Sequence, residues 1–202
     1  MKKRIAVLVS GGGTNLQALL DAEAAGKIPH GEIALVVSNK EGAYALERAR
    51  QAGVPGAVLT KKECGSQAAF EEALQAVLER NGTDLIILAG FLAILSESFT
   101  SKWPDRIINV HPSLIPSFCG EGFYGLKVHE AALSYGVKVT GATVHFVNEI
   151  PDGGKIIAQK AVYIEEGDTP EILQKRVMEQ AEWIILPQAV QLVSDKLSKE
   201  KN

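Results

Sequence analysis

The chain alternates short apolar runs with longer stretches in which apolar residues recur every three or four positions. Short runs rich in Val, Ile and Leu predict strands, and the longer period predicts amphipathic helices. In the first half these patterns take turns, which indicates an α/β fold built from strand–helix–strand units. The predicted strands are residues 5–10, 32–38, 57–59, 84–89 and 106–110, and the predicted helices lie near residues 15–25, 43–52, 66–80 and 96–103.

The predicted strands are apolar at nearly every position, as in Leu-Ile-Ile-Leu at 85–88. A strand that is apolar on both sides is buried on both faces, which is typical of a parallel sheet covered by helices. We therefore predict a Rossmann-like α/β architecture: an open, mainly parallel sheet with helices on both faces.

The second half changes this pattern after a predicted helix near residues 126–134. Residues 139–147 and 155–162 predict two strands joined across Pro-Asp-Gly-Gly, as in an antiparallel hairpin at the sheet edge. Thr169 followed by Pro170 predicts the start of the last helix, and Pro187 is expected to kink or divide it. No repeat or linker interrupts the chain, so we expect a single domain over residues 1–202.

Composition narrows the class of protein. The net charge of −3 disfavours a nucleic-acid partner, because such proteins present a broad basic surface. The apolar run at residues 5–9 is too short for a secretory signal, and no run approaches the roughly 18 residues of a membrane span. Cys64 and Cys119 form no C-x-x-C pair, so neither a disulfide framework nor a zinc site is indicated. We expect a cytoplasmic protein without a membrane partner.

The first candidate site is Ser-Gly-Gly-Gly-Thr-Asn at 10–15, between the first predicted strand and helix. Glycines let a ligand approach the backbone, and a helix N-terminus offers free N–H groups, so a phosphate is the natural ligand. No Gly-Lys-Ser/Thr follows, and Leu16 stands where a dinucleotide fingerprint has its third glycine. A tight turn that binds nothing would use the same glycines.

The second candidate is Asn109 with His111, at the end of a predicted strand. Residues two apart lie on the same side of an extended chain, and open α/β sheets bind ligands beyond the carboxyl ends of their strands. An amide beside an imidazole can polarise a carbonyl oxygen and move a proton. A capping Asn and a structural His would produce the same local pattern.

The third candidate is Asp152, in a sequence that also predicts an ordinary turn. Beside His111 its carboxylate would raise the pKa of the imidazole and make it a better proton donor. The other histidines, His30, His129 and His145, receive less weight. No pair of histidines has metal-ligand spacing, so we expect no metal.

Five segments carry a resemblance to a known family: Ser-Gly-Gly-Gly-Thr-Asn-Leu-Gln at 10–17, Leu-Ala-Gly-Phe at 88–91, Ile-Asn-Val-His-Pro-Ser-Leu-Ile-Pro at 108–116, Gly-Ala-Thr-Val-His-Phe-Val at 141–147 and Pro-Asp-Gly-Gly at 151–154. Over nearly its whole length the chain resembles the folate-dependent formyltransferases, and among them the phosphoribosylglycinamide formyltransferases. The resemblance implies transfer of the formyl group of 10-formyltetrahydrofolate, as co-substrate, to the amine of glycinamide ribonucleotide in purine biosynthesis.

The resemblance also implies roles. Asn109 would bond the formyl oxygen, His111 would be the general acid, and Asp152 would orient His111. The implied nucleotide-binding residues are Gly13, Thr14, Asn15 and Glu182, and the implied folate-binding residues are Gln67, Leu92, Ala93, Ile94, Leu95, Asn109, Asn148, Glu149, Ile150, Pro151 and Asp152.

Two departures concern the folate side. Members of the family often have an arginine where this chain has Ala93, and a basic residue near Gln67, which puts affinity for the glutamate tail in question. The glycine-rich stretch 117–125 has no predicted conformation, and the oligomeric state is not predicted.

Three alternatives remain. A methionyl-tRNA formyltransferase would have a further C-terminal domain, for which 202 residues leave no space, and its tRNA would favour a basic chain. A formyltetrahydrofolate hydrolase would use the same residues on water, usually with an N-terminal regulatory domain that a first strand at residue 5 does not accommodate. A non-catalytic nucleotide or folate binder would not need Asn109, His111 and Asp152 together.

Overall fold

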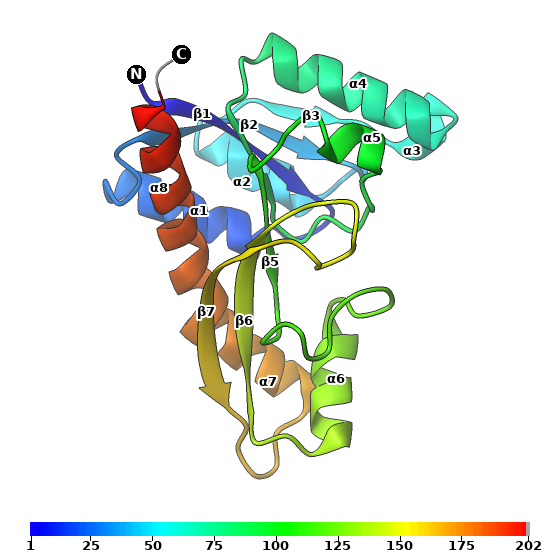
Figure 1. Ribbon diagram of the computed structural model, residues 1–202, viewed down its shortest axis with the longest axis vertical. Coiled ribbons are helices and arrows are strands. Elements are labelled where there is room, and N and C mark those ends of the chain that lie inside the picture. The colour runs from blue at the N-terminus through cyan, green and yellow to red at the C-terminus, as the bar shows by residue number, and fades with distance from the viewer. Residues whose placement is uncertain (201–202) are drawn as a thin grey trace.

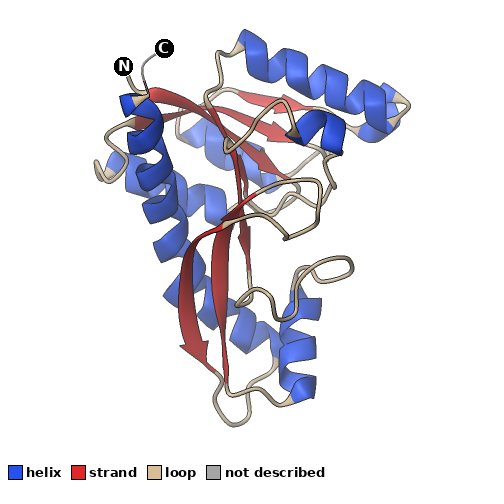
Figure 2. Ribbon diagram, viewed as in Figure 1, coloured by secondary structure: helices blue, strands red, loops and turns tan. Residues whose placement is uncertain are grey.

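A seven-stranded sheet forms the centre of the computed structural model, which describes residues 1–200 (Figures 1 and 2). The strand order is β3-β2-β1-β4-β5-β6-β7. The first five of these strands in space are parallel, and β6 and β7 complete the sheet as an antiparallel hairpin. This confirms the predicted fold class. The strands are β1 (Lys3–Val9), β2 (Gly31–Ser38), β3 (Gly56–Val58), β4 (Leu85–Leu88), β5 (Ile107–His111), β6 (Val139–Phe146) and β7 (Ile156–Tyr163).

Helices cover both faces of the sheet, as predicted. The helices are α1 (Thr14–Ala24), α2 (Tyr44–Gln51), α3 (Lys61–Cys64), α4 (Gln67–Arg80), α5 (Glu97–Thr100), α6 (Leu126–Tyr135), α7 (Pro170–Val177) and α8 (Trp183–Lys199), with a π-helical turn, η1 (Met178–Glu182), between the last two. None of the helices described between residues 1 and 200 is long and apolar enough to cross a membrane.

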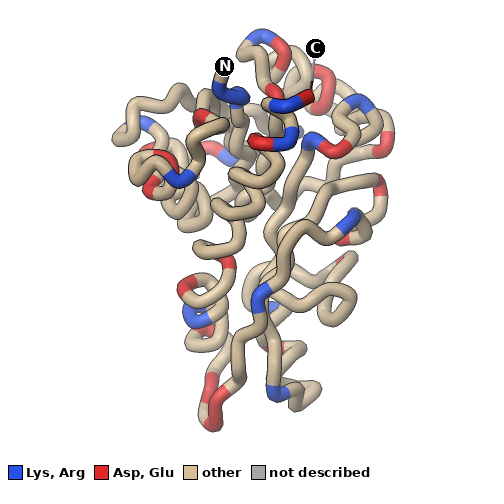
Figure 3. The backbone as a smooth tube through the Cα atoms, turned by 60° about the vertical axis from the view of Figure 1, so that its left-hand side comes forward, with Lys and Arg blue, Asp and Glu red and all other residues tan. Residues whose placement is uncertain are grey.

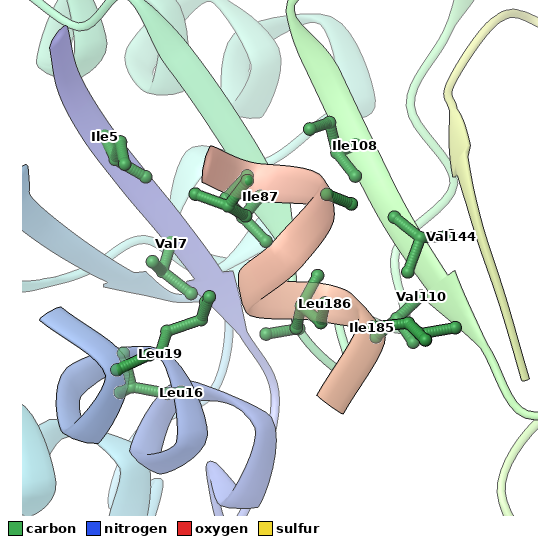
Figure 4. Close-up of a cluster of buried hydrophobic side chains, with 14 of the residues drawn as sticks. Ile5, Val7, Leu16, Leu19, Ile87, Ile108, Val110, Val144, Ile185 and Leu186 are labelled. Atoms are coloured by element: carbon green, nitrogen blue, oxygen red, sulfur yellow. The ribbon is translucent and has the colours of Figure 1, made fainter. Parts of the chain in front are cut away.

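Two hydrophobic cores lie on opposite faces of the sheet. Along β1, Ile5 and Val7 join a core with residues of α1 and α8, which Figure 4 shows in close-up. The alternate residues Ala6 and Leu8 join the second core, against α4 and α5. The two-residue period of a strand sends neighbours to opposite faces, so a strand covered on both sides must be apolar throughout.

The helical predictions differ from the structure at two short helices. α3 was not predicted, although Thr60 is its N-cap: the Thr60 hydroxyl accepts from the Glu63 N–H and donates to the Glu63 carboxylate. α5 is a single turn, whereas a helix to residue 103 was expected. Pro104 disfavours helical geometry at Trp103, and the chain turns at Asp105, whose φ is 55°.

Pro187 does not divide the last helix. Pro187 lies inside the continuous helix α8, and the interruption falls earlier, at η1. An α-helical proline crowds the carbonyl four residues before it, which here belongs to Trp183. The π turn ends at Glu182, directly before that residue, so the irregularity lies N-terminal to the proline.

Charged positions follow no division by sign. Figure 3 shows Lys and Arg interspersed with Asp and Glu along the chain. Local groups of charge therefore matter more here than the overall field.

Ile87 tests the sheet core, because it is fully buried at the centre of β4, between β1 and β5. We expect Ile87→Ala to lower the unfolding free energy by about 2–5 kcal/mol, through lost burial and the cavity left behind. Urea unfolding measures this, with Ile172→Ala, at a half-exposed position on α7, as control. A loss no larger than in the control would contradict the assigned core.

Candidate active site

The candidate site lies where the order of connection reverses in the parallel part of the sheet. From β1 the chain proceeds through β2 to β3, and then returns to the other side of β1 for β4 and β5. Such a reversal leaves a crevice at the carboxyl ends of the strands. The glycine loop follows β1, residues 89–96 follow β4, and β5 ends at His111.

A cleft of about 690 Å³ opens beside these strand ends, which is ample for a small organic ligand. Its walls come from four segments far apart in the sequence, at 90–95, 109–112, 120–125 and 147–152. Leu92, Ile94 and Ile150 are more than half exposed, so three large apolar side chains face solvent at one cleft. An exposed apolar wall of this kind is typical of a binding surface.

Asn109, His111 and Asp152 converge at the cleft, as expected. The first two project from β5, and Asp152 comes from the loop that joins β6 to β7. The Asp152 carboxylate lies 3.4 Å from His111 Nδ1 through Oδ2 and 3.4 Å from Asn109 Nδ2 through Oδ1.

Asp152 is an almost buried anion held by N–H groups. Its Oδ2 accepts a hydrogen bond from the Gly120 backbone at 2.8 Å, which links it to the 117–125 stretch. Burial raises the pKa of this carboxyl, but the hydrogen bonds and the neighbouring imidazoles outweigh burial and lower the pKa below its usual value. Gly154 is needed in the same loop, because a side chain there would collide with the Phe146 carbonyl.

The pKa of His111 moves in the direction opposite to the one expected. His111 is buried, and burial lowers its pKa by more than Asp152 and the Phe118 carbonyl raise it. His111 Nε2 donates to that carbonyl at 2.8 Å. The imidazole is therefore mainly neutral near pH 7. Burial destabilises its charged form more than the Asp152 carboxylate, 3.4 Å away, stabilises it.

His145 belongs to the site, although the sequence gave it little weight. It pairs directly with Asn109 across β5 and β6. Its Nε2 lies 3.2 Å from Asn109 Nδ2 and 3.5 Å from Asp152 Oδ1, while its Nδ1 donates to the Phe146 carbonyl. Pairing the predicted hairpin with the preceding strand would have revealed this contact, but the strand register was not known.

The glycine loop is fastened to α2. Gly13 has a φ of 73°, and a side chain there would collide with Ala45. The Gly11 carbonyl accepts from the Ala45 N–H, and the Gly12 carbonyl accepts from Arg48 Nε at 2.8 Å. No side chain caps the N-terminus of α1. These contacts leave the start of α1 suited to an anion. No local pattern pointed to Arg48.

Asn15 and Glu182 form a buried pair, in which Asn15 Nδ2 donates to Glu182 Oε2 at 2.7 Å. Burial raises the pKa of Glu182 to about 7, against the lowering effect of this hydrogen bond. Neither residue lines the cleft beside His111. Thr14 lines a separate hollow of about 620 Å³, which α1 and α8 border.

The structure places most of the expected folate residues on the cleft and leaves one out. The residues on the cleft wall are Leu92, Ala93, Ile94, Leu95, Asn109, Asn148, Glu149, Ile150, Pro151 and Asp152. Gln67 is not on the wall; its side chain donates to Glu71 and to the Ile94 carbonyl. Within residues 1–200, no three His, Cys, Asp or Glu side chains are grouped as metal ligands.

Comparison with known proteins gives consistent results. A family model described as formyl transferase matches residues 3–190. The chain is 43% identical to the phosphoribosylglycinamide formyltransferase of Haemophilus influenzae, covering 92% of this chain and 84% of that protein. It is 48% identical to a trifunctional purine biosynthetic protein of Gallus gallus, of which it spans 18%.

Solved structures agree with these sequence matches. Glycinamide ribonucleotide transformylase 1 from Symbiobacterium toebii superposes with a TM-score of 0.90 at 44% identity, covering 96% of this chain and 89% of that chain. Phosphoribosylglycinamide formyltransferase from Brucella melitensis gives a TM-score of 0.87 at 40% identity, covering 96% of each chain.

Glu182 allows a test through the pH dependence of stability. A pKa raised from 4.5 to about 7 means that the fold prefers the protonated form, so the contribution of Glu182 to stability falls as pH rises through that range. Between pH 4.5 and pH 8, we expect the unfolding free energy of Glu182→Gln to rise by about 3 kcal/mol relative to that of the wild type.

Urea unfolding across this pH range measures the difference. Glu179→Gln, at an exposed position of the same π turn, is the control and should follow the wild-type pH dependence. Parallel curves for the wild type and Glu182→Gln would show that Glu182 is not held protonated.

Proposed function

Because this chain belongs to the formyl transferase family, we propose that it transfers the formyl group of 10-formyltetrahydrofolate to the amine of glycinamide ribonucleotide. The observation that carries the proposal is the convergence of Asn109, His111 and Asp152 at a cleft with an exposed apolar wall. We also propose that a single domain over residues 1–202 carries the activity.

The chemistry begins when the substrate amine attacks the formyl carbon. A C–N bond forms, the formyl oxygen gains negative charge, and the tetrahedral intermediate collapses as the C–N bond to the folate breaks. The amine loses a proton and the leaving folate nitrogen gains one, so neither a metal nor a covalent enzyme intermediate is needed. Holding both substrates in place supplies much of the rate.

Asn109 and His111 stabilise the formyl oxygen in this proposal. Asn109 Nδ2 has two contacts, one with His145 Nε2 at 3.2 Å and a longer one with Asp152 Oδ1 at 3.4 Å, and the formyl oxygen would replace the longer one. The formyl oxygen would take the place of the Phe118 carbonyl at His111 Nε2. Negative charge developing there favours the protonated imidazole and offsets the burial that lowers its pKa, so that His111 can act as general acid.

The two substrates approach from different segments. The exposed side chains of Leu92, Ile94 and Ile150 suit the flat, apolar benzoyl ring of a reduced folate. The phosphate of the nucleotide would bind the N–H groups at Gly13, Thr14 and Asn15, where the α1 dipole favours an anion. Glu182 would lie toward the glycinamide end.

The first test is a spectrophotometric assay of tetrahydrofolate release from 10-formyltetrahydrofolate, run with and without glycinamide ribonucleotide. We expect release only when the nucleotide is present, because its amine is the acceptor. Release without the nucleotide would indicate hydrolysis instead. Binding of both ligands without any release would overturn the enzymatic assignment.

Substitutions at the cleft test the assigned roles. We expect His111→Ala or Asp152→Asn to lower kcat by about 10²–10⁴-fold, the usual effect of removing an acid–base group, with the fold retained by circular dichroism. His30→Ala, at a half-exposed histidine paired with Asp195, is the matched control. Near-normal turnover in both cleft variants would remove these residues from the mechanism.

A further inference from the structure

The segment that carries two of the three exposed apolar side chains at the cleft has no regular structure of its own. Residues 91–96 join β4 to α5 without forming a helix or strand, yet they present Leu92 and Ile94 at more than half exposure. An irregular segment with exposed apolar side chains keeps its shape only if other contacts hold its backbone. Those contacts come from both ends of the segment.

At its beginning, the segment is tied to the end of β1. The Leu92 N–H donates to Ser10 Oγ at 2.9 Å, and Ser10 Oγ in turn donates to Asn39 Oδ1 at 2.7 Å. At its end, Leu95 is buried in the core. Neither the Ser10 hydrogen bond nor the burial of Leu95 fixes the backbone at residues 94 and 96, where the segment leads into α5.

That part of the backbone is held by the first two turns of α4. Glu71 accepts from the Ser96 N–H at 2.7 Å and from the Ser96 hydroxyl at 2.5 Å. Gln67 Nε2 donates both to Glu71, at 2.7 Å, and to the Ile94 carbonyl, at 3.1 Å. Three hydrogen bonds thus link two side chains, one helical turn apart, to Ile94 and Ser96 of the wall, and a fourth joins the two side chains to each other.

Glu71 is unusual because its carboxylate is buried, at 6% exposure, without an ion pair among the described residues. Burying an anion is costly unless hydrogen bonds compensate it. Burial raises the pKa of Glu71, but the Ser96 and Gln67 hydrogen bonds outweigh it and leave the pKa below its usual value. The ionised carboxylate is therefore the acceptor, and bonds to an ionised group are stronger than neutral ones.

We propose that Glu71, supported by Gln67, is a positioning residue for the reduced folate, which holds residues 94–96 in the shape of the cleft wall before the ligand arrives. The proposal rests on the proposed function, which assigns this cleft to the folate. A wall formed in advance lowers the ordering cost of binding, so its loss should weaken folate binding and leave the chemical step alone. It also gives Gln67 a role without direct contact with the cleft.

Steady-state kinetics with each substrate varied is the central test. We expect Glu71→Leu, which keeps the side-chain volume, to raise KM for 10-formyltetrahydrofolate about tenfold, as expected for lost hydrogen bonds to a charge. KM for glycinamide ribonucleotide and kcat should stay within about twofold. Gln67→Met, which breaks only the Gln67 hydrogen bonds, should raise the folate KM by a smaller factor. Glu72→Gln, the exposed neighbour on α4, is the control.

Hydrogen exchange gives a readout that does not depend on the function. Amides of residues 94–96 should exchange faster in Glu71→Leu, while those of α4 stay protected. Calorimetry with 5-formyltetrahydrofolate should show binding weakened about tenfold. Failure of the wild type to bind this folate would overturn the assigned ligand. Unchanged exchange at residues 94–96 in a folded Glu71→Leu would overturn the proposed role of Glu71. A fall in kcat together with equal rises in both KM values would also overturn the role proposed for Glu71.

Discussion

The candidate site depends on one nearly buried carboxylate. Asp152 faces His111, His145 and Asn109 and accepts from the Gly120 backbone, so it joins β5, β6 and two irregular segments around a single charge. A buried anion of this kind is stable only while its donors stay in place. The charge therefore gives a physical reason for the 117–125 stretch and the β6–β7 loop to keep their positions beside the end of β5.

The same arrangement explains the protonation state of His111. Asp152 and the Phe118 carbonyl both favour the charged imidazole, but burial disfavours it more strongly and lowers the pKa. In the proposed mechanism, an imidazole with this balance is neutral in the absence of substrate and gains a proton as negative charge develops beside it. The opposing effects of burial and charge thus suit the general-acid role proposed for His111.

Irregular backbone at the site is held by polar side chains from regular elements. Arg48 on α2 holds the Gly12 carbonyl, and Glu71 on α4 holds Ser96. On the far side, the π turn η1 places Glu182 in a buried hydrogen bond with Asn15. For Arg48 and Glu71, a side chain on a helix fixes the backbone of a loop at the candidate site, which is how a rigid scaffold positions functional loops.

The sequence by itself determined most of the helices and strands and the candidate residues of the site. Strands that are apolar at nearly every position are buried on both faces, and the two-residue spacing of Asn109 and His111 places them on one side of β5. The motif at 108–116 identified the family because its residues are contiguous. These features are local, since they follow from backbone geometry within a few residues.

Only the tertiary structure decided which distant residues meet. The pairing of Asn109 with His145 depends on the β5–β6 register, and the reach of Asp152 depends on the path of a nine-residue connection between β6 and β7. The turn of Gln67 toward Ile94, the placement of the helix irregularity before Pro187 and the lowered pKa of His111 all depend on packing between elements. Burial and long-range contact are properties of the assembled fold, so no local pattern in the chain encodes them visibly.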